Sequence, residues 1–143
     1  MSEEDPIKVI LSNNSPIEGT FNPTSFIKKV LKLKNITTGT FEFAFVSPEQ
    51  IQSLNKAYLN KDEPTDIISF NLGTPNNIIG DVYICIEKAK ENAKYYNSTL
   101  EKELRLLLVH GILHLLDYKD YTEKEKQIMR AEESRLLTLL EET

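Results

Sequence analysis

The stretch HGILHLLDYKD, residues 110–120, is the part of the sequence around which the rest of the fold can be predicted. It holds both histidines of the chain, His110 and His114, at the end of an apolar run that begins near Leu100. Side chains four positions apart leave the same side of an α-helix, so two imidazoles at this spacing can reach one transition-metal ion. The alternative is that both are ordinary polar residues of a half-buried helix. We favour a metal site because acidic residues follow at the offsets where a third ligand is expected.

Two acidic residues compete for the position of the third ligand. In the long zinc-protease motif, a glycine stands three residues after the second histidine, and a third ligand stands three residues further on. That spacing assigns the turn to Asp117 and the ligand to Asp120. A helix that continued would bring Asp117 to the face of the histidines, but aspartate tolerates the positive φ of a helix-ending turn better than most residues. We therefore predict that Asp117 ends the helix and that Asp120 joins the two histidines.

The composition is that of an ordinary globular chain. Its 143 residues, 40% hydrophobic and 27% charged, suit a single domain, residues 1–143, with a real core. The one cysteine, Cys85, lies in an apolar run and should be a buried thiol. The acidic start MSEEDP lacks the features of a signal peptide, and no apolar stretch reaches the roughly 20 residues that span a bilayer. We expect a cytoplasmic protein without a membrane partner.

The charge of the chain argues against a broad nucleic-acid-binding surface. The net charge is −5 and the isoelectric point is about 5.1, whereas proteins that bind nucleic acid through a large surface are usually basic. Neither value excludes a local basic groove. From composition alone RNA is an unlikely partner, and DNA is not expected.

The hydrophobic pattern predicts an α+β fold. The clearest strand contains Phe41, Phe43 and Phe45 in alternation with other residues, and Ser98 to Glu101 has the pattern of a capping box that opens the histidine helix. The expected architecture is one four-stranded mixed sheet packed by about five helices, with the metal site at the end of a central helix. The predicted strands are 7–11, 41–45, 66–72 and 79–86; the predicted helices follow Asn22, span 48–59 and 87–97, and begin after Ser98 and Thr122.

Three segments together resemble a known family. They are the histidine stretch, the segment LNKAYLNKDEPTDIISF at residues 54–70, and IGDVYI at residues 79–84. All three are similar to the YbeY-like bacterial endoribonucleases, also called ribosomal RNA maturation factors. The resemblance implies a compact α+β fold with one zinc ion per chain and metal-dependent cleavage of single-stranded RNA. It also implies a role in small-subunit ribosomal RNA maturation, with the ribosome or its associated factors as partners.

The chain departs from that family at three positions. Asp120 stands where the family usually has a third histidine, and Asp117 where it usually has glycine. An aspartate remains a competent ligand but changes the charge and hardness of the site, so the identity of the metal is less secure. Leu59 stands where the family commonly carries an arginine that would suit a phosphate. Lys61, Lys56 or some other cation must then replace it, or phosphate recognition is weaker.

The resemblance and the residue types suggest the remaining roles at the site. Two imidazoles and one carboxylate leave a tetrahedral zinc ion one open position for water, whose pKa the metal lowers from about 16 to roughly 7. Asp81 is the candidate catalytic residue that orients this water; it is equally well explained as a strand-start residue that caps a turn. The candidate substrate-binding residues are Lys61, Thr65 and Ser69, although Thr65 and Ser69 are at least as well explained as solvent-facing.

Aromatic residues supply a further expectation, because single-stranded RNA is often held by stacking on aromatic rings. Tyr58 and Tyr118 are the candidates. Tyr58 lies on the apolar stripe of its helix, so we expect it to pack in the core. Tyr96 is likewise expected to face inward from the helix predicted over 87–97.

Two other functions remain open. The first is a small zincin-like metallopeptidase; against it, Gly111 stands where that motif has a glutamate that accepts a proton. The second is a non-catalytic ribosome-associated factor in which the metal is structural, which the acidic isoelectric point and Leu59 keep open. Metal-dependent cleavage of single-stranded RNA distinguishes the endoribonuclease from both.

Overall fold

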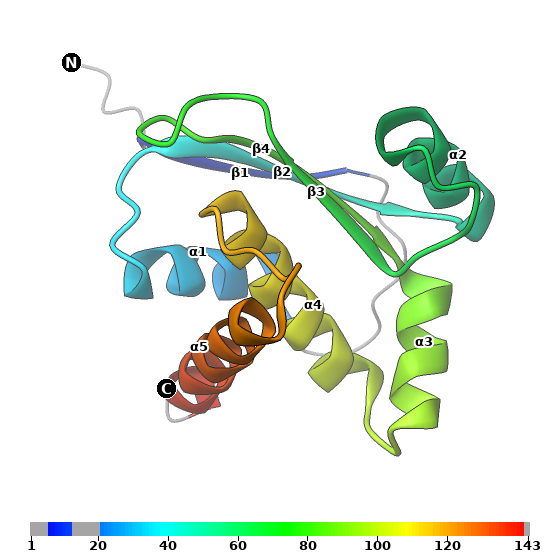
Figure 1. Cartoon of the computed structure of the whole chain (residues 1–143). Helices are drawn as coiled ribbons and strands as arrows, with labels where there is room; N and C mark the ends of the chain where they lie inside the picture. The colour runs from blue at the N-terminus through cyan, green and yellow to red at the C-terminus, as the bar shows by residue number, and fades with distance from the viewer. Residues whose placement is uncertain (1–5, 13–20, 142–143) are drawn as a thin grey trace.

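The computed structural model describes residues 6–12 and 21–141, and it confirms the predicted α+β fold (Figure 1). The acidic segment 1–5, on which the expectation of no signal peptide rests, lies outside these residues. In chain order the elements are β1 (Ile7–Ser12), α1 (Pro23–Leu33), β2 (Gly39–Val46), α2 (Pro48–Leu59), β3 (Ile67–Asn71), β4 (Ile79–Cys85), α3 (Ile86–Tyr95), α4 (Leu100–Leu115) and α5 (Glu123–Glu141).

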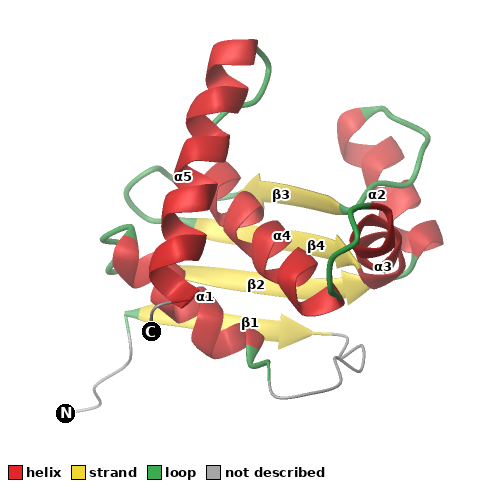
Figure 2. Ribbon diagram, turned by 90° about the horizontal axis from the view of Figure 1, so that it is seen from below, coloured by secondary structure: helices red, strands yellow, loops and turns green. Residues whose placement is uncertain are grey.

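The four strands form one mixed sheet in the order β1-β2-β4-β3 (Figure 2). The pairs β1–β2 and β2–β4 are parallel, and β3 pairs with β4 in the antiparallel direction. Phe41 and Phe43 of β2 are completely buried, because alternate residues of this strand face the core that the helices cover. Strand β3, which carries the segment 67–71, is left at an edge of the sheet.

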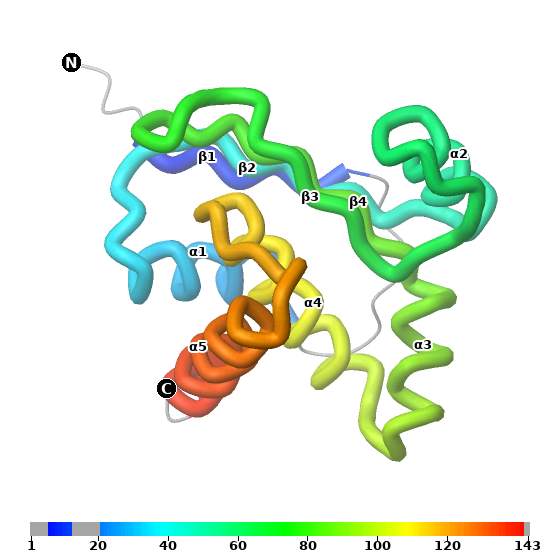
Figure 3. Tube along the Cα trace, viewed as in Figure 1, coloured from blue at the N-terminus to red at the C-terminus, as the bar shows by residue number. Residues whose placement is uncertain are grey.

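The helices divide unequally between the two faces of the sheet. Helices α1, α4 and α5 lie on one side, and α2 lies on the other, as the chain trace in Figure 3 also shows. The side chains of Phe41, Phe43 and Val82 belong to the larger core, together with the buried residues of α4. A smaller cluster of Ile51, Ile68 and the predicted buried thiol of Cys85 lies under α2.

Helix α4 crosses the middle of the larger core and carries both histidines. Its N-cap is Thr99, whose side chain accepts a hydrogen bond from Lys102 N at 3.2 Å, so the cap lies one residue later than the predicted capping box at Ser98. Gly111 lets the helix lie directly on the sheet, since a Cβ atom there would be 2.8 Å from Ile67 Cδ1 and 3.1 Å from Ser69 Oγ. The Ser69 hydroxyl donates to the Gly111 carbonyl oxygen at 3.2 Å. The helix is thereby fixed against β3.

Two aromatic residues do not occupy the buried positions that we predicted. Tyr58 is 67% exposed and Tyr96 is 71% exposed, so the prediction that they pack in the core is wrong. Tyr96 is the C-cap of α3, because that helix begins and ends earlier than predicted and its apolar face ends before this residue. Tyr58 lies in the last turn of α2, where one face of its ring packs on Phe70 of the edge strand with the ring centroids 5.2 Å apart.

Within residues 6–12 and 21–141, no helix is both long and apolar enough to cross a membrane.

Candidate metal centre

The structure brings the three predicted metal ligands together at the C-terminal end of α4. His110 Nε2 lies 3.0 Å from His114 Nε2, which lies 3.5 Å from Asp120 Oδ2. One candidate ligand atom from each residue can be chosen so that all three lie within 4.8 Å of one another. All three side chains are partly exposed, so the cluster is open to solvent and to a substrate.

Asp117 ends the helix, as predicted, and the turn at this residue brings Asp120 close to the two histidines. Its φ is 71°, and its N–H donates to the carbonyl oxygen of His114 at 3.0 Å. The following N–H, of Tyr118, donates to Leu113 O at 3.0 Å. These two bonds and the positive φ form a Schellman motif, the commonest way of closing a helix C-terminus. The Asp117 side chain is 85% exposed and pairs with Lys119, so its carboxylate points away from the imidazoles.

Hydrogen bonds on the far side of each ring fix the orientation of both imidazoles. His110 Nδ1 lies 2.6 Å from Glu133 Oε2, and His114 Nδ1 lies 3.0 Å from the carbonyl oxygen of Tyr118. The Tyr118 carbonyl oxygen can only accept a hydrogen bond, and the Glu133 carboxylate also accepts. Each Nδ1 therefore carries the proton and donates it. In the neutral rings Nε2 is then the unprotonated nitrogen on the side of Asp120.

This donor set fits a transition-metal ion. Two Nε2 lone pairs and a carboxylate oxygen face one another at 3.0 and 3.5 Å, an arrangement that is repulsive without a positive charge between them. Ligands at about 2.0–2.2 Å from a tetrahedral zinc ion are separated by roughly 3.3 Å, which is close to both distances. The cluster is therefore able to hold a metal ion.

The surroundings move the pKa values of the two imidazoles in opposite directions. Burial lowers the pKa of His110, but the hydrogen bond and charge of Glu133 outweigh it, and the net pKa is raised. Burial and then the positive charge of His110 lower the pKa of His114. His114 therefore stays neutral, which is the state that binds a metal, at pH values where His110 still takes up a proton.

Sequence reasoning missed Glu133, the partner of His110. This carboxylate comes from α5 and is only 8% exposed. It lies 23 residues from His110 along the chain, and a glutamate within an acidic helix gives no local signal of such a contact. A carboxylate behind a metal-binding histidine fixes its tautomer and raises its basicity.

We expect Glu133→Ala to weaken zinc binding by about 10–100-fold, the usual cost of losing such a partner. Glu133→Gln should lose less, because its amide oxygen still accepts from Nδ1. Competition with a chromogenic chelator measures both affinities. Glu123→Ala is the matched control on the same helix, since that side chain is 80% exposed and pairs with Lys126 across 3.8 Å. Equal zinc affinity in the wild type and Glu133→Ala would contradict the role of this carboxylate.

A second support from α5 holds the backbone that orients His114. The Tyr118 hydroxyl accepts from Lys34 Nζ at 2.8 Å, and Lys34 also donates to Glu132. Arg135 donates to the same Glu132 carboxylate through Nε and a terminal nitrogen, at 2.6 and 2.8 Å. The Tyr118 ring packs against the larger core, so this tyrosine anchors the turn between the helix and Asp120.

The ion cluster of Lys34, Glu132 and Arg135 should make stability depend on pH. Hydrogen bonds from Arg135 and Lys34, against an opposing effect of burial, lower the pKa of Glu132 from 4.5 to about 2. A lowered carboxylate pKa stabilises the fold above the ordinary pKa, and this contribution is lost as the pH falls towards the lowered value. We expect Glu132→Gln to cost about 1–2 kcal/mol at pH 6, less than the full shift implies because solvent screens the cluster.

Urea unfolding of the wild type and Glu132→Gln at pH 6 and pH 3 checks this expectation. The difference in free energy of unfolding between the two proteins should shrink at pH 3, because Glu132 of the unfolded wild type takes up a proton below its ordinary pKa while the folded state remains mostly ionised. A difference that is equal at both pH values would show that the charge of Glu132 does not support the fold.

The predicted substrate-binding residues lie beside the cluster. Lys61, Thr65 and Ser69 line a hollow of about 350 Å³ together with His110, His114 and Asp120. The loop that carries Lys61 and Thr65 is held by buried Asn55, whose amide donates to Glu63 O at 2.9 Å. Because the Ser69 hydroxyl donates to α4, Ser69 contributes mainly to the wall of this hollow.

Of the two named lysines that could replace the family arginine, Lys61 is the one that lines this hollow. Leu59 lines the same hollow with an apolar side chain that is 48% exposed. Lys56 pairs with Asp62 across 3.8 Å on the surface. Among the described residues that line the hollow, Lys61 is thus the one lysine or arginine.

The structure does not bring Asp81 together with the three ligands. Its strand neighbours, Gly80 and Val82, face α4, since a Cβ on Gly80 would meet Leu115 and one on Gly111 would meet Val82. The alternation of the strand therefore points Asp81 to the opposite face of the sheet. There its charge adds to burial in raising the pKa of Tyr83. The sequence pattern showed the alternation but not which face the histidine helix covers.

Fold and site together define the class of the protein: a small α+β protein with a candidate metal centre of two histidines and one aspartate on a sheet-covering helix. Residues 12–141 match the family model described as Endoribonuclease YbeY. The chain belongs to this family.

Similar proteins align with this chain over most of their length. A curated Endoribonuclease YbeY of Christiangramia forsetii is 34% identical over 137 residues, which cover 96% of each chain. One from Carboxydothermus hydrogenoformans is 44% identical over 104 residues, 71% of this chain and 73% of the relative. A solution structure of a Thermotoga maritima protein superposes with a TM-score of 0.64 at 29% identity, covering 91% of this chain and 85% of that one.

Proposed function

We propose that this protein is a metal-dependent endoribonuclease that cleaves single-stranded RNA during maturation of small-subunit ribosomal RNA. Residues 1–143 act as one domain in the cytoplasm, and His110, His114 and Asp120 hold one zinc ion. The observation that carries the proposal is the convergence of these ligands in a hollow that also contains Lys61. Family membership supports the RNA substrate, because the relatives are named as endoribonucleases.

The chain's own residues position the substrate around this centre. A bound zinc ion supplies an activated water at neutral pH and polarises a phosphoryl oxygen. Lys61 binds the phosphate next to the cleaved bond. This phosphate needs a cation, and Leu59 stands where the family commonly has an arginine for that purpose. Thr65 lies on the loop held by Asn55; its hydroxyl donates to Asp66 Oδ1 at 3.5 Å, and its oxygen accepts from a ribose hydroxyl of the RNA. We assign no proton transfer to Asp81, since it lies on the other face of the sheet.

Geometry at Gly111 argues against the metallopeptidase alternative. The glutamate of the peptidase motif follows its first histidine directly, which is the position of Gly111 here. A side chain at this position would enter the contact between α4 and the sheet, where a Cβ is already 2.8 Å from Ile67 Cδ1. A peptidase glutamate therefore has no room here and would not point at the metal.

The test compares cleavage of a labelled single-stranded RNA, its duplex, and a single-stranded DNA of the same sequence. Protein stripped by a chelator should be inactive, and one equivalent of zinc should restore cleavage of the single-stranded RNA alone. Tight binding to RNA or to small ribosomal subunits without cleavage at any zinc level would support the non-catalytic factor instead. Zinc-dependent hydrolysis of peptides without cleavage of RNA would support the peptidase.

A further inference from the structure

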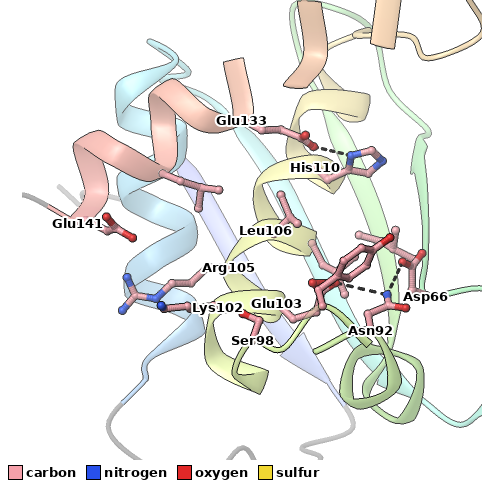
Figure 4. A pocket seen from close by; sticks show the side chains of 14 residues that line it. Asp66, Asn92, Ser98, Lys102, Glu103, Arg105, Leu106, His110, Glu133 and Glu141 are labelled. Carbon is pink, nitrogen blue, oxygen red and sulfur yellow. Dashed lines mark hydrogen bonds and ion pairs between the residues drawn. The ribbon is translucent and has the colours of Figure 1, made fainter. Parts of the chain in front are cut away.

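A second hollow, of about 730 Å³, lies along α4 next to the candidate metal centre (Figure 4). Its lining comes from α3, α4, α5 and the start of β3. Asp66, Ile67 and His110 line both this hollow and the one that contains Lys61, so the metal centre lies where the two meet. We call it the α4 groove. An RNA strand bound at the metal centre can continue along this groove.

The α4 groove combines apolar walls with a small polar group. Ile67, Leu106, Leu107 and Leu137 supply the apolar part of its lining. Tyr96 also lines the groove, and its ring is 71% exposed. A volume between about 300 and 1,000 Å³, mostly apolar walls and a few convergent polar groups are typical of a binding site for a small organic group. The exposed ring offers a surface on which a flat ligand stacks.

The polar part of the groove holds four carboxylates, those of Asp66, Glu103, Glu133 and Glu141, and two cations, Lys102 and Arg105. Asn92 Nδ2 donates to Asp66 Oδ2 at 3.0 Å and to Glu103 Oε2 at 3.3 Å, as the dashed lines in Figure 4 show. These two bonds use both donors of the amide, whereas each carboxylate accepts several more. Glu103 is 7% exposed, and burial, with the charge of Asp66 added, raises its pKa despite the bond from Asn92. Asp66 Oδ1 also accepts from the Thr65 hydroxyl at 3.5 Å, whereas Asn92 is the one donor to the Glu103 side chain among the described residues. Glu103 is therefore short of donors.

We propose that the α4 groove binds a guanine base of the RNA strand that passes the metal centre, and this proposal rests on the proposed function for its ligand. The Watson–Crick edge of guanine carries two adjacent N–H donors, which a carboxylate accepts together. Adenine and cytosine present one donor beside an acceptor, and uracil presents one donor between two acceptors. Glu103 and Asp66 read the guanine edge, and Tyr96 stacks on the base.

The groove does not hold the phosphates of the strand. Its lining holds four carboxylates, Glu133 and Glu141 among them, against two cations, Lys102 and Arg105, and this excess of negative charge repels the phosphates. Phosphates belong instead at the neighbouring hollow, where Lys61 lies. The two hollows thus divide the RNA between a backbone subsite and a base subsite.

The test measures RNA binding by the full chain in a chelator, so that no cleavage interferes. Fluorescence anisotropy gives the Kd of a uridine hexamer and of the same hexamer with one internal guanine, adenine or cytosine. A bidentate pair to a base edge corresponds to about tenfold or more in affinity. We expect the guanine hexamer to bind about tenfold more tightly than the other three.

Three variants separate reading of the base from support of the fold. Glu103→Gln keeps an acceptor for Asn92 but places an N–H₂ group beside the base, so it should remove the guanine preference and leave binding of the uridine hexamer unchanged. Tyr96→Ala should weaken binding of the guanine hexamer by about tenfold, the usual loss of one stacking partner. Ile128→Ala is the control for loss of an exposed apolar side chain, because Ile128 is 51% exposed and is not part of the lining of the groove; Tyr95 is unsuitable, since its ring packs on Tyr96 with the centroids 4.9 Å apart.

Equal Kd values of the wild type for all four hexamers would overturn the proposal. So would a guanine preference that survives both Glu103→Gln and Tyr96→Ala, because the base would then bind elsewhere. The outcome is separable from the proposed function. A guanine preference without zinc-dependent cleavage would refute the proposed nuclease activity and support the base subsite. Zinc-dependent cleavage without any base preference would support the nuclease activity and refute the base subsite.

Discussion

His114→Ala is expected to remove zinc from the protein and to lower RNA cleavage by more than about 100-fold. His114 Nε2 is the central ligand atom of the cluster, 3.0 Å from His110 Nε2 and 3.5 Å from Asp120 Oδ2. Its loss leaves two ligand side chains, which is fewer than the three protein ligands of catalytic zinc sites. The effect should therefore exceed the 10–100-fold expected for an outer partner such as Glu133.

Metal content by mass spectrometry and cleavage of a single-stranded RNA measure both parts of this prediction. The ring of His114 is 28% exposed, so its removal leaves no large cavity, and the circular dichroism spectrum should be unchanged. A folded variant that keeps one equivalent of zinc and full activity would show that the metal is held elsewhere.

The second large expected effect is a difference in zinc content between variants of the two aspartates that follow the helix. Asp120→Ala should lose zinc, because Asp120 supplies the one carboxylate of the cluster. Asp117→Gly should keep it, since the Asp117 side chain is 85% exposed and pairs with Lys119. Glycine is the matched replacement here because φ at this position is 71°, which glycine adopts more readily than alanine.

Zinc content per chain, measured after exhaustive dialysis against zinc-free buffer, distinguishes the two variants. The reverse result, with zinc lost from Asp117→Gly and kept in Asp120→Ala, would mean that the turn reorganises when the metal binds. Loss from both would point to a turn that tolerates no change.

Local sequence patterns predicted the parts of the site that depend on local geometry. Helical spacing placed His110 and His114 on one face, and the tolerance of aspartate for positive φ identified Asp117 as the end of the helix. The order of strands and helices followed from alternation, helical periodicity and caps in the same way. These features involve residues within a few positions of one another, so a single sequence contains the information.

Contacts between distant elements were not predictable in this way. Glu133 meets His110 across 23 positions, and Lys34 meets Glu132 across 98. Asp81 shows the same limit, because alternation assigns it to one face of β4 without saying which face α4 covers. Tyr58 and Tyr96 are exposed because each lies at the end of its helix, where helical periodicity no longer determines burial.

Glu132 and Glu133 lie next to each other on α5, and together they make the order of the candidate centre depend on this one helix. One supports His110 directly, and the other supports the turn behind His114 through Lys34 and Tyr118. Detachment of α5 from α4 would remove the support of both imidazoles at once. Local opening of this helix alone would therefore free the ligand side chains.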